Sequence, residues 1–149
     1  MGSVSGESTI EIDAPVQRCF DLAADPDGTP RWQDSVKRTK VLERDGEGKP
    51  TLVETHIHAL VKDLQVALRF DWDEPHELRW VRESGDLAGV RGHWRFEDLG
   101  GGRTRATYFL DIDPGRMLSM MLRGPLVDQL RRHLTKQPPE GLKQAAEAA

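Results

Sequence analysis

Apolar residues fall on every second position in six stretches of the chain between residues 35 and 113. This alternation is typical of β-strands that bury one face and expose the other. In the clearest stretch, the apolar positions are Leu64, Val66, Leu68, Phe70 and Trp72. Clusters of turn-forming residues separate the stretches, so we predict antiparallel strands over residues 36–44, 51–59, 63–72, 77–82, 89–99 and 104–113.

The N-terminal region predicts one more strand and a short helix. Ile10 and Ile12 alternate with polar residues over 7–13, which indicates a strand. Pro15 suits the first turn of a helix, and an apolar stripe with helical spacing follows it, formed by Val16, Cys19, Phe20 and Ala23. Residues 25–30 are dense in turn formers and end this helix, and a short irregular or helical turn begins at Trp32.

Beyond residue 115 the apolar spacing becomes helical and Met-rich. One stripe contains Met117, Met120, Met121, Gly124, Val127, Leu130 and Leu134. Pro125 predicts a kink or a new helix start, and the Pro138-Pro139 pair divides off a last segment over 140–147. Because one helix about 10 Å wide does not fill the concave face of a wide curved sheet, the pattern predicts a cavity.

Length and charge narrow the class of protein. A chain of 149 residues fits one domain, with an ordered core expected over about 7–147. The net charge of −4 argues against nucleic acid as a partner, and leaves room only for a local basic patch. No apolar run is long enough to span a bilayer and the N-terminus lacks a secretory pattern, so we expect a cytoplasmic protein without integral membrane association.

Four short motifs follow one another along the chain. They are Ile10-Glu11-Ile12-Asp13-Ala14-Pro15, then Asp25 with Pro30-x-Trp32, then Gly101-Gly102-Arg103-Thr104 before the strand holding Tyr108, and finally Gly141-Leu142-Lys143. Together they resemble the polyketide cyclase/dehydrase and lipid-transport (SRPBCC) family of the START and Bet v 1-like superfamily. The resemblance extends from about residue 7 to residue 147.

The resemblance implies an α+β helix-grip fold. In that fold a curved seven-stranded antiparallel sheet wraps on a long C-terminal helix, with one or two short helices after the first strand. The family includes aromatase/cyclases, coenzyme Q-binding proteins, and sterol and lipid carriers. A shared fold does not choose among these functions.

The predicted concave face supplies the candidate ligand-binding residues. Aromatic and methionine side chains there either complete the core or line a tunnel for a small hydrophobic ligand. The candidates are Trp32, Phe70, Trp72, Trp80, Trp94, Phe96, Tyr108, Met117, Met120 and Met121.

Two residues are candidates for catalysis if the protein is an enzyme. The aromatase/cyclases that this chain resembles use an inward Arg on a central strand, with Tyr and Trp nearby. The alternation turns Arg69 to solvent and Arg82 inward, unless a bulge brings Arg82 out at the end of its strand. Arg82 and Tyr108 would then orient and polarise a substrate carbonyl.

The leading hypothesis is binding or transport of a small apolar ligand such as a lipid, isoprenoid or polyketide. The alternatives are a polyketide cyclase/dehydrase and a non-catalytic interaction module with a closed cavity. The sequence contains no serine-nucleophile, Walker, dinucleotide-binding or paired-cysteine motif, and we expect no cofactor. His56 and His58 share a strand face, but without an assured third ligand we expect no metal site.

Overall fold

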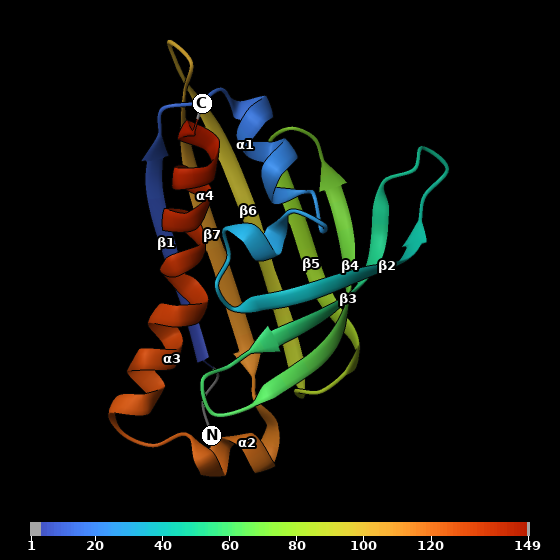
Figure 1. The fold of residues 1–149 in the computed structure, drawn as a ribbon, viewed down its shortest axis with the longest axis vertical. Coiled ribbons are helices and arrows are strands. Elements are labelled where there is room, and N and C mark those ends of the chain that lie inside the picture. The colour runs from blue at the N-terminus through green and yellow to red at the C-terminus, as the bar shows by residue number, and fades with distance from the viewer. Residues whose placement is uncertain (1–3, 149) are drawn as a thin grey trace.

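A seven-stranded antiparallel sheet forms most of the molecule. The structure is a computed structural model and describes residues 4–148 (Figure 1). The strands are β1 (Val4–Ile12), β2 (Val36–Arg44), β3 (Pro50–His58), β4 (Asp63–Asp73), β5 (Glu77–Gly85), β6 (Gly89–Gly100) and β7 (Arg103–Asp113). They pair in the order β1-β7-β6-β5-β4-β3-β2, so the first two strands of the chain form the two edges.

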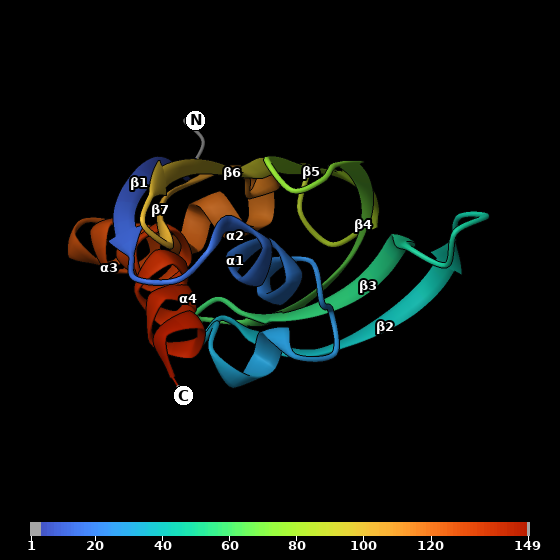
Figure 2. The same ribbon diagram turned by 90° about the horizontal axis from the view of Figure 1, so that it is seen from above.

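The helices lie on the concave side of this sheet. Two short ones, α1 (Val16–Ala23) and the 3-10 helix η1 (Thr29–Arg31), connect β1 to β2. The C-terminal region forms α2 (Gly115–Met121), α3 (Pro125–Thr135) and α4 (Gln137–Glu147). Viewed from above, the sheet curves so that β5 and β6 lie on one side of α1 while β2 and β3 lie on the other (Figure 2).

The predicted helix-grip fold, with its curved seven-stranded antiparallel sheet, is confirmed. The predicted strand 36–44 has the observed bounds of β2, while β1 runs over Val4–Ile12 instead of 7–13. Gly101 and Gly102 make the turn between β6 and β7 with φ of 65° and 76°, a left-handed geometry that favours glycine. The alternation of sequence therefore located both the strands and their buried faces.

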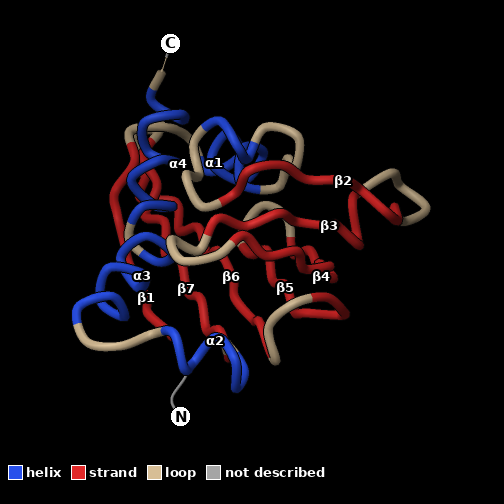
Figure 3. Tube along the Cα trace, turned by 60° about the horizontal axis from the view of Figure 1, so that its bottom comes forward, coloured by secondary structure: helices blue, strands red, loops and turns tan. Residues whose placement is uncertain are grey.

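The C-terminal segment is divided more sharply than one kinked helix. Leu122 and Gly124 separate α2 from α3, with Gly124 at φ 55° and Pro125 opening α3. Pro138 and Pro139 lie inside the first turn of α4, where a missing amide hydrogen costs no helical bond. Figure 3 shows α3 and α4 following one another as a bent helix, with α2 as a separate turn.

The helices are too short or too polar to cross a lipid bilayer. Within residues 4–148, no helix has the length and apolar character that a membrane span requires.

Candidate functional site

A cavity lies between the concave face of the sheet and the helices. Its volume is about 100 Å³, which is room for several water molecules. Strands β2 to β7 contribute most of its lining, and α1, the segment that follows it and Leu134 of α3 complete the wall. This volume is smaller than that of most ligand pockets.

One wall of the cavity is aromatic. Trp80 lies 5.9 Å from Phe70 and 5.7 Å from Tyr108 between ring centroids, and Trp94 lies 4.6 Å from Tyr108. Gly92 makes room for this arrangement, because a Cβ there would lie 2.7 Å from the Trp80 indole. These rings form a rigid surface suited to a flat or apolar molecule.

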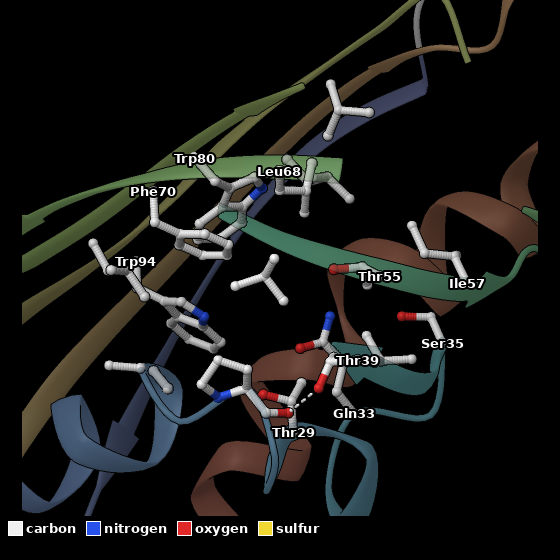
Figure 4. A pocket seen from close by; sticks show the side chains of 18 of the residues that line it. Thr29, Gln33, Ser35, Thr39, Thr55, Ile57, Leu68, Phe70, Trp80 and Trp94 are labelled. Carbon is white, nitrogen blue, oxygen red and sulfur yellow. Dashed lines mark hydrogen bonds between the residues drawn. The ribbon is translucent and has the colours of Figure 1, made fainter. Parts of the chain in front are cut away.

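The opposite wall carries neutral hydrogen-bonding groups. Figure 4 shows Thr29, Gln33, Ser35, Thr39 and Thr55 across the cavity from the aromatic rings. Ser35 and Thr55 are buried, while the Thr39 hydroxyl is already engaged because it donates to the carbonyl of Pro26 at 2.8 Å. This wall therefore offers hydroxyl and amide groups without any charge.

Tyr108 joins the two walls. Burial raises the pKa of its phenol well above the ordinary value of 10.0, and an interaction with the Gln33 side chain acts in the opposite direction. The phenol therefore stays protonated at every physiological pH. In the cavity it acts as a hydrogen-bond donor and not as a base.

Trp72 lies at the edge of the cavity. Its indole nitrogen donates to the carbonyl of Pro50 at 2.9 Å, and the Lys49 ammonium lies 5.4 Å from the ring centroid. Phe20 of α1 meets the same ring edge-on at 5.5 Å. Trp72 and Pro50 are half-buried, as are Pro26, Thr29 and Thr39 of the lining, so the cavity approaches the surface along this side.

The structure brings together five of the ten predicted ligand-binding residues. Of the predicted set, those that line the cavity are Phe70, Trp72, Trp80, Trp94 and Tyr108. Trp32 and Phe96 are buried behind this lining, where both contact Trp94, at 6.1 Å and 5.6 Å between centroids. They hold the aromatic wall in place and do not face the cavity.

The three methionines lie elsewhere, so their predicted place in the lining is corrected. Met117, Met120 and Met121 are 79%, 65% and 49% exposed, whereas their neighbours Leu118 and Ser119 are buried. Because α2 ends at Met121 and α3 begins anew at Pro125, the two helices do not share one continuous face. The single apolar stripe predicted across both helices therefore placed the exposed side of α2 against the core.

The structure keeps Arg82 in the inward phase that the alternation predicts. Arg82 pairs with Leu68, and the register between β4 and β5 shifts only after this pair, where Ser84 pairs with Ala67. The Arg82 side chain runs toward the strand end, where it donates to the carbonyl of Gly85 at 2.7 Å. Arg82 is half-buried and is not part of the cavity lining.

Arg69 faces solvent as expected, where it pairs with Glu83 and Glu43.

The polar wall of the cavity was not predicted from the sequence. Thr55 shares the inward phase of Val53 and Ile57, so its position was readable, but Gln33 and Ser35 lie in a connection without periodicity.

The histidines form contacts of their own outside the cavity. The Nδ1 atom of His58 lies within hydrogen-bond distance, 3.0 Å, of an Asp63 carboxylate oxygen, and the His58 ring meets that of His133 at 6.0 Å between centroids. Within residues 4–148, no cluster of three His, Cys, Asp or Glu side chains has the geometry of a metal site.

Comparisons with known proteins place this fold. A search of curated proteins finds no relative. The structure is similar to a START superfamily protein from Mycobacterium smegmatis, with a TM-score of 0.84, 18% identity, and 98% of each chain covered. It is also similar to a protein from Thermus thermophilus, with a TM-score of 0.80, 23% identity, and 97% of this chain and 99% of that chain covered.

An aromatase/cyclase from a Streptomyces species is similar too, with a TM-score of 0.73, 18% identity, and 96% of this chain and 93% of that chain covered. At these identities the likeness shows the fold alone. The model of one family, described as polyketide cyclase / dehydrase and lipid transport, matches residues 12–137. With most of its length matched, this chain belongs to the polyketide cyclase / dehydrase and lipid transport family.

Proposed function

We propose that this protein binds and carries a small, uncharged, largely apolar molecule in the cavity. The observation that carries the proposal is the chemistry of the lining, in which no described residue is charged. Burying an ion without a partner of opposite charge is strongly unfavourable, so a neutral ligand is favoured. The aromatic wall would accommodate its apolar body.

The polar wall gives the ligand a direction. Gln33, Ser35 and Thr55 lie together, so a carbonyl or hydroxyl group on the ligand would be oriented toward them. The Tyr108 phenol adds one donor that remains protonated. A molecule with an apolar body and one neutral polar end therefore fits both walls.

The size of the cavity limits how the ligand is held. A volume of about 100 Å³ accommodates a small molecule, and a larger one requires the walls to separate. The half-buried Trp72 at the surface edge is the side chain whose movement would widen the space.

A cyclase or dehydrase activity has less support from the same lining. Arg82 lies outside the cavity, and Tyr108 is the one acidic group among the described lining residues. The raised pKa of Tyr108 favours hydrogen-bond donation over proton abstraction. Ligand binding therefore accounts for the lining without requiring the catalytic groups that a cyclase or dehydrase needs.

A matched pair of dyes tests the proposal. We expect neutral N-phenylnaphthylamine to bind with enhanced fluorescence and its charged analogue anilinonaphthalene sulfonate to bind at least ~10-fold more weakly, because the lining offers no cation. Val53→Phe fills the cavity and should abolish binding of the neutral dye, whereas Val81→Phe, at an exposed position, should leave it unchanged.

Native mass spectrometry of the purified protein then identifies any molecule that remains bound. Equal affinity for both dyes, or unchanged binding by a folded Val53→Phe variant, would overturn the proposal. The thermal melting curve of each variant shows that it is folded.

A further inference from the structure

The short helix α2 presents an apolar outer surface. Met117, Met120 and Met121 are 79%, 65% and 49% exposed, which makes them the three most exposed large apolar residues on this helix. The inner side of α2 is also apolar, since Leu118 is buried against the core. Solvated methionine clusters of this kind mark surfaces that bind flexible or variable apolar partners.

The C-terminal segment that contains α2 differs in net charge from the whole chain, although one carboxylate, Asp113, directly precedes it and accepts from the backbone N–H of Gly115 at 3.0 Å. Residues 114–136 carry five cationic side chains and one carboxylate, a net charge of +4, whereas the whole chain carries −4. The only acid in this segment, Asp128, is paired with Arg131 at 2.8 Å. Within the described chain Arg116 has no ion pair, and Arg123 contacts only the carbonyl of Met120.

We propose that α2 and the following turn form a docking surface for an anionic lipid bilayer. The three exposed methionines would enter the boundary between headgroups and acyl chains, and Arg116 and Arg123 would contact lipid phosphates. Apolar side chains flanked by arginines are the combination that binds such an interface, where each feature alone binds weakly.

The charge pattern favours a bilayer over a second copy of the chain. In a two-fold dimer formed through this surface, α2 would face α2, and the arginines of both copies would lie close together. Like charges across an interface are unfavourable. An anionic bilayer meets the same surface with the opposite charge.

The inner side of α2 connects the docking surface to the cavity. Leu118 and Leu122 close a small apolar void whose wall also includes Ile57 and Leu134. Ile57 and Leu134 line the main cavity as well. The surface that meets the bilayer is therefore the outside of the cover over a small void that shares wall residues with the cavity. Docking itself does not depend on a bound ligand.

Vesicle cosedimentation tests the proposal with the full chain. We expect binding to vesicles of equal parts phosphatidylglycerol and phosphatidylcholine, little binding to pure phosphatidylcholine, and a loss of binding as salt is raised. A triple variant with Met117→Ser, Met120→Ser and Met121→Ser should bind at least ~10-fold more weakly. A double variant with Arg116→Gln and Arg123→Gln should lose a comparable factor, ~20-fold.

Matched controls separate this surface from general stickiness and general charge. Val81→Ser and Leu42→Ser remove exposed apolar residues elsewhere, and Arg38→Gln with Lys40→Gln removes two exposed cations of β2. Both controls should bind like the unmodified protein. Equal losses in the controls, no binding to anionic vesicles, or concentration-dependent dimerisation that the methionine variant abolishes without any vesicle binding would overturn the proposal.

Discussion

Helix α2 begins the C-terminal segment and helix α4 ends it, yet the two differ in how deeply they are buried. On α4, Pro138, Pro139, Gly141, Leu142 and Ala146 are buried against the rest of the fold. On α2, only Leu118 and Ser119 are buried, and three methionines project outward. One helix is embedded in the structure, while the other lies on its surface.

Hydrogen bonds increase the contrast. At the start of α4, Gln137 accepts from the backbone of Asp34 at 3.0 Å and donates to the carbonyl of Trp32 at 2.9 Å. At its end, Arg18 of α1 donates to the carbonyls of Ala146 and Ala148 at 2.6 and 3.0 Å. The side-chain bond recorded at the end of α2 comes from nearby Arg123.

The difference teaches how the cavity is enclosed. The segment around Trp32, which α4 fixes, supports the aromatic wall through the Trp32–Trp94 contact. Helix α2 has seven residues, of which only Leu118 and Ser119 are buried. Regions with few buried contacts open more easily than the core, so we expect α2 to open at a lower free-energy cost than α4.

The largest expected effect comes from Gly141. A Cβ at this position would lie 1.9 Å from the backbone oxygen of Trp32, which cannot move without displacing the segment that supports Trp94. We expect Gly141→Ala to lower the free energy of unfolding by about 3 kcal/mol, measured by chemical denaturation.

Gly46→Ala is the matched control because its Cβ would meet no atom within 4 Å. It should change the free energy of unfolding by less than about 0.5 kcal/mol. Similar stabilities for the two variants would show that α4 is not tightly embedded.

The next effect compares one side chain from each helix. Leu142 of α4 is fully buried, and Leu142→Ala should cost about 2–3 kcal/mol through lost burial and the space left behind. Met117 of α2 is 79% exposed, so Met117→Ala should cost less than about 0.5 kcal/mol. Thermal and denaturant unfolding of both variants measure the difference, and equal costs would contradict the contrast.

Amide hydrogen exchange sharpens the same comparison without any substitution. We expect the amides of α2 to open with a free energy at least about 1 kcal/mol lower than those of α4. Mass spectrometry of peptides over 115–121 and 137–147 measures both. If α2 exchanges as slowly as α4, then it is not the mobile end of the enclosure.

The smallest effect is a pH dependence at Glu147, near the end of α4. The backbone N–H of Asp13 donates to this carboxylate at 2.8 Å and Lys143 pairs with it, which lowers its pKa below the ordinary value of 4.5. A lowered folded pKa means that its stabilising contribution is fully present above pH 4.5 and is lost as the pH falls through the folded value.

We therefore expect Glu147→Gln to be less stable than the unmodified protein at neutral pH, with the difference disappearing at strongly acidic pH. Denaturation curves across this range provide the measurement. Glu140→Gln is the control on the same helix, since Glu140 is exposed and forms no ion pair with the described residues. A difference that persists unchanged at low pH would contradict the role of the Glu147 charge.

The sheet was the part of the fold most readable from sequence. Successive side chains of a strand point to opposite faces, so the apolar positions within each strand indicate its buried face. This prediction needs no information from the rest of the chain. Phe70, Trp72, Trp80, Trp94 and Tyr108 follow this rule, and all of them line the cavity. Their shared side of the sheet was determined locally.

Arg82 and the methionines needed the tertiary structure. Arg82 keeps the inward phase of Trp80, but it is the last residue before a bulge in β5, and its guanidinium reaches the carbonyl of Gly85 at the strand end and does not line the cavity. The break at Leu122–Gly124 resets the helical phase, so the stripe before it does not predict the face after it. A change in helical phase exchanges the buried side of a helix for its exposed side.

The sequence by itself determined that an antiparallel sheet with an aromatic concave face is covered by helices, because strand alternation is a local property. Only the tertiary structure decided that Gln33, Ser35 and Thr55 meet opposite those rings, since these residues come from a connection and a separate strand. It also decided that the methionines face solvent, because the side of a short helix that is buried depends on what it packs against.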